Sequence, residues 1–123
     1  MQKIHTDNAP KAVGPYSQAI VSNGFVFTSG QIAINPETNT IEATDIAGQT
    51  EQVMKNLDAV LTASGSSFDK AVKTSCFLAD MNDFAAFNEI YGRFFKSLPA
   101  RSCVAVKTLP KNALVEVEVI AEV

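Results

Sequence analysis

The chain has 123 residues and a mass of 13.2 kDa, the length of one domain, which excludes a two-domain enzyme. Its composition, 46% hydrophobic and 19% charged, indicates a folded core over residues 1–123 and excludes a disordered chain. The net charge of −3 disfavours nucleic acid or an anionic membrane as the main partner. One His, two Cys and two Arg are too few for most metal sites, for Ser/His/Asp chemistry or for a broad phosphate-binding surface.

Cysteine spacing and the first residues indicate a reducing compartment. Cys76 and Cys103 lack the C-x-x-C or Cys/His spacing of a zinc site or a dithiol redox motif. Met1–His5 lacks the apolar segment of a secretion signal, and no run approaches the roughly 18 apolar residues of a membrane span. We therefore expect a cytoplasmic protein with reduced thiols, no metal and no membrane partner.

The first third of the chain has the composition of β-strands. Residues 19–21 and 25–28 are rich in β-branched and aromatic side chains. They flank Asn23-Gly24, the strongest hairpin-turn signal in the sequence. A second turn is expected at residues 35–39.

A long helix follows these strands. It is predicted to begin at Thr44 or Asp45, whose side-chain oxygens can cap free backbone N–H groups, and to end at Gly65. Its apolar residues recur at helical spacing and form one stripe: Ile46, Val53, Leu57, Val60 and Leu61.

The second half begins with a predicted strand at Val72–Leu78 and continues with a helix after the capping residues Asp80–Asp83. This helix is expected to end near Ser97–Pro99, because proline disfavours helical continuation. Arg93 is interpreted as part of its solvated face. Its aromatic residues recur at helical spacing and indicate core packing: Phe84, Phe87, Tyr91, Phe94 and Phe95.

Two strands are predicted at the C-terminal end, at residues 101–108 and 114–123. In a simple hairpin of these strands, Arg101 would lie opposite about Ala121 rather than Glu116. Arg101 and Glu116 can therefore share a site only if the strands pair differently or if a subunit boundary brings them together.

This order of elements predicts an α+β fold in which two helices cover one face of a sheet. The other face would carry side chains that are poorly suited to solvent: Cys103, Ala105, Leu114 and Ile120. We infer a homo-oligomer in which sheet faces pack together. A monomer with a moderately apolar open face is the alternative.

Four segments carry a family resemblance that covers nearly the whole chain. In chain order they are Gly14–Gln18, Thr28–Gln31, Asp80–Phe84 with Asn88 and Tyr91, and Pro99–Cys103 followed by Leu109–Lys111 and Val115–Glu118. Together they resemble the RidA (YjgF-type) family of enamine/imine deaminases. The last block is much more specific than any single motif.

The resemblance implies a chorismate-mutase-like α+β fold, with ferredoxin-like topology and two helices on one face of a mixed sheet. It implies a homotrimer whose sheets form a central barrel, with ligand sites between adjacent subunits. The implied activity is that of a 2-iminobutanoate/2-iminopropanoate deaminase, which hydrolyses 2-aminoacrylate and related imines to 2-keto acids and ammonia without cofactor or metal. An imine carbon is already electrophilic, so the protein need mainly orient carboxylate, proton and water.

Three residues are implied as catalytic. Arg101 would hold the substrate carboxylate through two parallel charge-assisted hydrogen bonds, and a surface salt bridge is the alternative. Cys103 shares the face of Arg101 and would contribute mainly through its backbone. Glu116 would position the hydrolytic water and transfer a proton if burial raises its pKa. A solvated pair with Glu118, which alternation places on the same face, is the alternative reading.

The same resemblance implies four residues that bind substrate. The Ser29 hydroxyl and the Gly30 N–H would bind the ligand carboxylate beside the arginine, and Tyr16 would reach the pocket across the subunit interface. Asn88 lies four residues after Phe84 on the same side of its helix. An amide there needs hydrogen-bond partners, which favours a role in the site or the interface.

Two other functions stay open. A non-catalytic module would bind keto acids or similar metabolites through Arg101, or act like a chaperone, without Glu116 chemistry. An RNA-acting protein, an endoribonuclease or translation inhibitor, is disfavoured by two arginines and a net charge of −3. The connection Lys96–Leu98 is shorter than in longer bacterial members, which leaves the preferred substrate size open.

Overall fold

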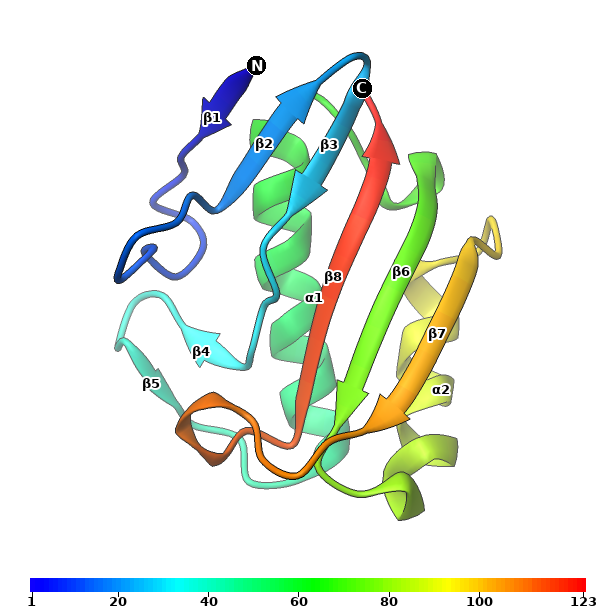
Figure 1. Cartoon of the computed structure of the whole chain (residues 1–123). Helices are drawn as coiled ribbons and strands as arrows, with labels where there is room; N and C mark the ends of the chain where they lie inside the picture. The colour runs from blue at the N-terminus through cyan, green and yellow to red at the C-terminus, as the bar shows by residue number, and fades with distance from the viewer.

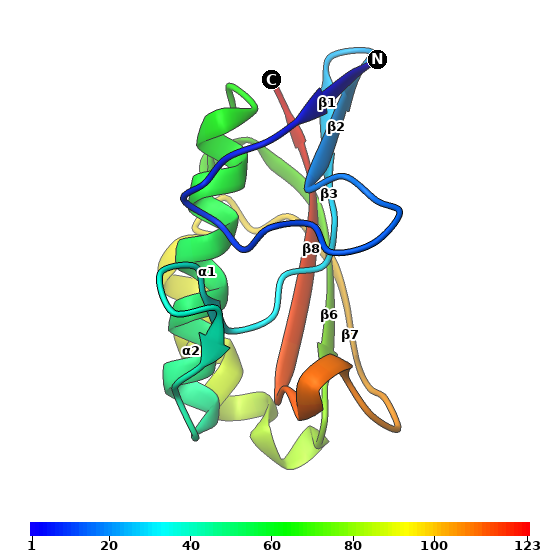
Figure 2. The same ribbon diagram turned by 90° about the vertical axis from the view of Figure 1, so that its left-hand side faces the viewer.

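The computed structural model describes all 123 residues as a mixed sheet with both helices on one face (Figures 1 and 2). The strands are Gln2–Ile4 (β1), Ala19–Ser22 (β2), Phe25–Thr28 (β3), Ile34–Asn35 (β4), Thr40–Ile41 (β5), Ala71–Leu78 (β6), Ala100–Ala105 (β7) and Val115–Glu122 (β8). The helices are Ile46–Ala63 (α1) and Phe84–Phe94 (α2), with short 3-10 turns at Phe68–Lys70 (η1), Met81–Asp83 (η2) and Pro110–Asn112 (η3).

The main sheet has six strands in the order β1-β2-β3-β8-β6-β7, and β4 and β5 form a small second sheet. Neither helix is long and apolar enough to cross a membrane.

The predicted hairpin at the start of the sheet is confirmed. Strands β2 and β3 are antiparallel, and Ser22 pairs with Phe25 across the turn. Asn23 and Gly24 have φ angles of 52° and 81°, the left-handed conformation that a two-residue hairpin turn of type I′ requires at both positions. Asn and Gly adopt this conformation at little steric cost, so the local sequence sets the register of these strands.

Helix α1 begins and ends where its capping residues predict. The Asp45 carboxylate accepts a hydrogen bond from the Gly48 N–H at 3.1 Å, an N-cap that contributes about 1 kcal/mol. Gly65 adopts a φ of 79° just past the end of the helix, where a left-handed residue terminates helical hydrogen bonding.

Helix α2 ends at Phe94, so the prediction that it continues to about Ser97 is wrong. Phe95 leaves the helical conformation, and its fully buried ring stacks on Tyr91 with 4.5 Å between centroids. A turn follows in which the Leu98 N–H donates to the Phe95 carbonyl. Burial of this ring in the core outweighs a further helical turn before the proline.

The two C-terminal strands do not pair with each other, because β6 lies between them. Strand β7 runs parallel to β6, with Arg101 opposite Thr74, and β8 runs antiparallel to β6, with Glu116 opposite Phe77. A helical crossover suits a parallel neighbour, so α2 delivers β7 beside β6. Strand β8 then fills the space between β3 and β6, which excludes a simple hairpin of β7 with β8.

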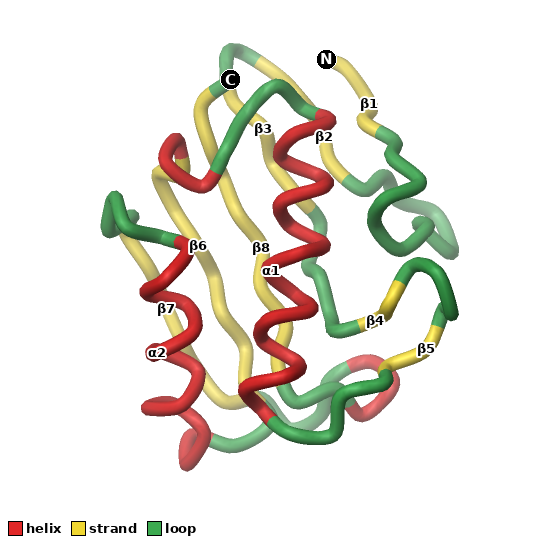
Figure 3. The backbone as a smooth tube through the Cα atoms, turned by 180° about the vertical axis from the view of Figure 1, so that it is seen from behind, coloured by secondary structure: helices red, strands yellow, loops and turns green.

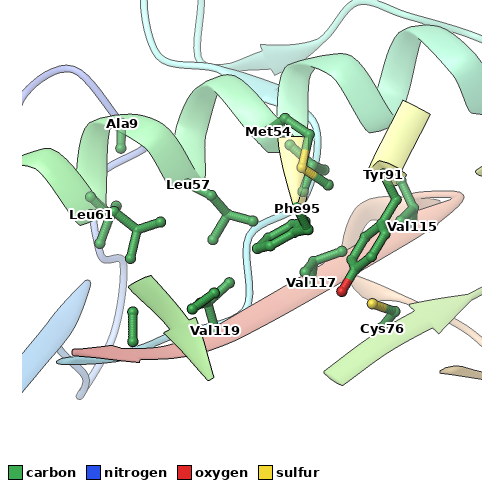
Figure 4. Close-up of a cluster of buried hydrophobic side chains, with 14 of the residues drawn as sticks. Ala9, Met54, Leu57, Leu61, Cys76, Tyr91, Phe95, Val115, Val117 and Val119 are labelled. Atoms are coloured by element: carbon green, nitrogen blue, oxygen red, sulfur yellow. The ribbon is translucent and has the colours of Figure 1, made fainter. Parts of the chain in front are cut away.

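The core lies between the sheet and the two helices (Figures 3 and 4). Figure 4 shows Val115, Val117 and Val119 of β8 on the side of the sheet that faces the helices. The aromatic residues predicted to form core on α2 are buried at Phe87, Tyr91 and Phe95 and half-buried at Phe84 and Phe94.

The prediction that Cys103 and Ala105 lie on the open face of the sheet is wrong. They pair with Cys76 and Leu78 of β6, which are buried toward the helices, and paired residues share a face. The error follows from strand order. Because β7 pairs with β6, the residues of β7 that point toward the helices are those that lie opposite the buried residues of β6.

The open face nevertheless carries apolar side chains. Ile120 lies there as predicted and is half-buried, whereas Leu114 precedes β8 and is also half-buried. Larger apolar residues on this face are exposed: Phe25 by 37%, Phe27 by 44% and Val104 by 49%. Exposure of such an apolar face to water costs free energy unless another surface covers it.

Candidate functional site

A β-bulge at the end of β3 shapes one part of the candidate site. Phe27 pairs with Ile120, and the next pair along is Gln31 with Val117, which leaves one extra residue on the first strand. The Gln31 and Val117 backbones exchange hydrogen bonds of 2.9 and 3.1 Å, so pairing resumes beyond the bulge. Bulges re-aim side chains and backbone groups, and this one presents residues 28–30.

Four predicted site residues line one hollow with a volume of about 760 Å³: Tyr16, Ser29, Gly30 and Glu116. Its wall comes from the connection between β1 and β2, the bulge, the residues around β4 and β5, η3 and β8. Figure 1 shows that these elements meet on one side of the sheet, away from β7. The fold therefore brings together residues from distant parts of the sequence.

Glu116 lies directly against Gly30. A Cβ atom added to Gly30 would lie 2.8 Å from the Glu116 Cδ atom, so the absence of a side chain there makes room for the carboxyl group. Burial raises the pKa of Glu116, and the neighbouring Glu118 raises it further. A half-buried carboxyl group with a raised pKa is suited to accept and return a proton.

Hydrogen bonds tie the bulge to the preceding connection. The Ser29 hydroxyl donates to the Ser17 carbonyl at 2.6 Å, and the Ser29 N–H donates to the Gln18 carbonyl at 2.9 Å. The buried Gln18 amide in turn bonds to Thr6 and Pro10. Ser29 is half-buried, and these hydrogen bonds hold it in place.

Tyr16 lies on the exposed part of this connection. Its side chain is 53% exposed, and its hydroxyl accepts a 3.4 Å hydrogen bond from the Val13 N–H. Figure 2 shows that part of the connection between β1 and β2 projects beyond the sheet on the side away from the helices. Tyr16 therefore lines the hollow while about half of its side chain is open to solvent.

Arg101 lies in a different environment, between β7 and α2. Its guanidinium carbon lies 4.8 Å from the centroid of the Tyr91 ring and 5.4 Å from that of Phe84. Nη1 donates to the Asn88 Oδ1 at 2.7 Å. No carboxylate forms an ion pair with Arg101, in contrast to Arg93, which is exposed and pairs with glutamates as a solvated residue does. The surface salt bridge considered for Arg101 is therefore wrong.

The two thiols near Arg101 are poor nucleophiles. Burial raises the pKa of the Cys76 thiol to about 12. Burial also raises the pKa of Cys103, although the charge of Arg101 opposes the shift. Because the thiolate is the reactive form, neither residue fits a role as attacking group. The structure also contains no cluster of three His, Cys, Asp or Glu side chains that could hold a metal ion.

The predicted residues therefore form two separate groups within one chain. Arg101, Cys103 and Asn88 lie on the helix side of the sheet, whereas Glu116 belongs to the opposite face. Strand β6 separates the two strands involved. The expectation that Ser29 and Gly30 lie beside the arginine is not met within one copy of the chain.

Comparison with known proteins gives the family. The family model described as Endoribonuclease L-PSP matches residues 6–123. The chain belongs to this family. A RutC family protein of Synechocystis is 52% identical over 124 residues, which cover 98% of this chain and 95% of that protein. Reactive Intermediate Deaminase A, a chloroplastic protein of Arabidopsis thaliana, is 47% identical over 119 residues, which cover 96% of this chain and 64% of that protein.

The fold comparison agrees with this assignment. The crystal structure of E. coli TdcF with bound serine is 41% identical, with a TM-score of 0.94, and the match covers 100% of this chain and 99% of that one. The resemblance to the RidA family and the α+β fold of a mixed sheet with two helices are confirmed. Members of the L-PSP/RidA family carry names of different activities, so membership alone does not select the reaction.

The sequence of this L-PSP/RidA chain held signals for further residues of the Arg101 group. The helical spacing of Phe84 and Tyr91 predicts core packing, and both belong to a segment that carries the family resemblance; in the structure their rings also flank the guanidinium. Phe84, Asn88 and Tyr91 are spaced four and three residues apart, which places them on one helix face. That spacing predicts a shared environment for the amide and both rings. The contact of Ser29 with Ser17 had no such local signal.

Proposed function

We propose that the chain hydrolyses reactive imines of small 2-keto acids, such as 2-iminopropanoate and 2-iminobutanoate, to the keto acid and ammonia. The observation that carries this proposal is the unpaired Arg101 guanidinium, which is half-buried, held by Asn88 and without a carboxylate partner. Arginine has five N–H donors in a planar fork, and here a single one has an acceptor in the chain. A substrate carboxylate would complete this arrangement through paired charge-assisted hydrogen bonds.

We infer that a complete site forms between two copies of the chain. Arg101 and Glu116 face opposite sides of the sheet, so one copy cannot present both groups to a small molecule. The exposed apolar residues Phe25, Phe27 and Val104 favour packing of the open face against other copies. A closed homotrimer would use the same contact three times and yield three equivalent sites.

In the proposed reaction, water adds to the imine carbon while Glu116 accepts a proton from that water. The proton passes to the nitrogen and a carbinolamine forms. Glu116 then moves the hydroxyl proton to the nitrogen, the C–N bond breaks, and ammonia leaves as the keto group forms. The raised pKa of Glu116 suits both proton transfers. Cys103 is not needed as a nucleophile.

An RNA substrate fits the hollow less well. Glu116 and Glu118 line it together with Lys11 and Lys111, so its wall has no excess of positive charge. The whole chain carries a charge of −3, which opposes binding of a phosphate backbone.

The reaction is tested with 2-aminoacrylate generated in place by a serine dehydratase, with loss of the imine followed over time. We expect the wild-type chain to accelerate this loss well above the rate in buffer. Arg101→Ala should lower the rate by at least about a hundredfold, because two charge-assisted hydrogen bonds are lost. The matched control Arg93→Ala removes the exposed arginine of α2 and should leave the rate unchanged.

Each failure has a separate meaning. A wild-type rate equal to that in buffer would overturn the deaminase proposal. Full activity in Arg101→Ala would overturn the assignment of this arginine, although the reaction itself would stand. RNA cleavage that persists through purification and scales with the amount of this protein would favour the RNA-acting alternative.

A further inference from the structure

The Ser29 hydroxyl has a fixed polarity. Its Oγ lies 2.6 Å from the Ser17 carbonyl oxygen, and a carbonyl has no proton to give. The serine must therefore donate its single hydroxyl proton to Ser17. The oxygen keeps its lone pairs, and Ser29 lines the hollow beside Glu116. Toward a ligand, Ser29 is thus an acceptor and cannot also donate to a carboxylate.

The next residue has the opposite polarity. The Ser29 and Gln31 N–H groups donate to Gln18 and Val117, but the Gly30 N–H has no backbone or side-chain acceptor in the chain. The Glu116 carboxyl group lies against Gly30, as shown by the 2.8 Å approach to its added Cβ. The bulge therefore offers an acceptor and a donor side by side, next to a proton-carrying group.

We propose that the Ser29 Oγ accepts a hydrogen bond from the nitrogen on C2 of the substrate and thereby selects the imine over its keto acid product. This assignment rests on the proposed function and deepens it. An imine or iminium carries N–H at C2, whereas the keto acid carries at the same atom an oxygen without hydrogen. A charged iminium N–H makes the stronger hydrogen bond, and the keto oxygen would face serine lone pairs. Ser29 then favours binding of the reactive form and release of the product.

The test compares two ligands with one carbon skeleton, L-2-aminobutanoate and 2-oxobutanoate. Their binding to wild-type protein and to Ser29→Ala is measured by calorimetry. We expect Ser29→Ala to weaken binding of the amino ligand by about tenfold or more, since a hydrogen bond to a charged group is lost. Binding of the keto acid should change by less than about threefold. Ser29→Thr retains a hydroxyl and should retain the preference for the amino ligand.

A matched control separates this role from anchoring of the connection. Gln18→Ala removes the side-chain bonds to Thr6 and Pro10, which loosens the same segment without touching the Ser29 oxygen. Looser anchoring should weaken both ligands by similar factors. If Ser29→Ala also weakens both ligands equally, Ser29 is only an anchor and the assignment is overturned. A larger loss for the keto acid would identify the hydroxyl as a donor and overturn it too.

The binding test is independent of turnover. A selective loss for the amino ligand in Ser29→Ala, together with a wild-type chain that does not hydrolyse imines, would overturn the reaction and support the Ser29 assignment. A wild-type chain that binds neither ligand would overturn the Ser29 assignment even if imine hydrolysis is observed. Should Ser29→Ala fail to fold, Ser29→Cys keeps the shape with a weaker acceptor and should show a smaller loss of the same sign.

Discussion

The Arg101 group and the hollow around Glu116 differ in how the fold builds them. Arg101 projects from a regular strand onto a regular helix, between two aromatic rings and an amide. The hollow is built from a β-bulge, a long connection and a short turn, and it presents backbone groups and carboxyl groups. The first region supplies fixed positive charge, and the second supplies proton transfer and polar contacts. Each lacks what the other has, and the sheet separates them.

The largest expected effect comes from splitting the two regions between copies. Arg101→Ala and Glu116→Gln should each be nearly inactive alone. The two variants are then co-expressed and allowed to co-assemble at random. Activity should return to about a quarter of the wild-type rate, because about a quarter of the sites receive an intact arginine from one copy and an intact glutamate from the next. Imine loss by the mixed protein is the measurement.

The same mixture discriminates between two arrangements. If both groups acted from one chain, every copy would carry one defect and no mixture would regain activity. Absence of recovery in a co-assembled sample, verified by mass spectrometry of the oligomers, would therefore contradict the intersubunit site.

Next in size is the contact between Gly30 and Glu116. Gly30→Ala places a methyl group where the Glu116 carboxyl lies, so the flexible carboxyl must move away. We expect turnover to fall by about tenfold or more, since displaced catalytic groups are costly, while the protein stays folded. Imine loss and thermal unfolding measure the two properties.

Gly92→Ala is the matched control for this change. Gly92 lies exposed in α2, where an added Cβ meets nothing within 4 Å. Alanine there should leave turnover unchanged and raise the free energy of unfolding by about 0.5–1 kcal/mol. An equal loss of turnover in both variants would show that the Gly30 contact has no special role.

A smaller effect is expected when the hydrogen bond behind the Tyr91 ring, which contacts Arg101, is removed. The Tyr91 hydroxyl and the Thr74 hydroxyl form a buried 2.8 Å hydrogen bond. Tyr91→Phe removes this bond and should lower the free energy of unfolding by about 1 kcal/mol. Because the ring that faces Arg101 remains, turnover should stay within about threefold of wild type. A complete loss of turnover at normal stability would instead give the hydroxyl a direct part in the reaction.

The smallest expected effect is a pH dependence of stability at Glu116. Because burial and Glu118 raise its folded-state pKa, the folded chain binds this proton more tightly than the unfolded chain. The contribution of protonated Glu116 to the free energy of unfolding is therefore fully present below the ordinary pKa of glutamate, and it is lost as pH rises through the raised pKa of the folded state. Glu116→Gln should be more stable than wild type at neutral pH, and the difference should vanish in acid. Urea midpoints across this range measure it.

Glu118→Gln is the reference for that experiment. Glu118 is exposed on the same strand face, so its replacement should change the pH profile less than replacement of Glu116. An equal change in the two variants would show that burial at Glu116 has little effect on stability.

Local features of the sequence were sufficient to predict much of the fold. Asn23-Gly24 specifies a hairpin, Asp45 and Gly65 bound α1, and alternation places Glu116 and Glu118 on one face. These features depend on interactions between residues close in sequence, which composition and spacing report directly. Motif resemblance singled out Arg101, which the structure leaves without a carboxylate partner.

Other features depended on distant contacts. The side of the sheet on which Cys103 lies follows from the pairing of β7 with β6, and the early end of α2 follows from burial of Phe95. Neither the order of strands nor the gain from burying a particular ring can be read from a short window of sequence.

By itself, the sequence determined the α+β class, the limits of α1 and the small set of groups available for chemistry: one His, two Cys and two Arg. Only the tertiary structure decided how these groups are distributed. It placed Arg101 and Glu116 on opposite sides of the sheet, and it committed the Ser29 proton to Ser17. The physical reason is that caps, turns and alternation act over a few residues, whereas sheet order and hydrogen-bond polarity arise from segments that meet only in the folded chain.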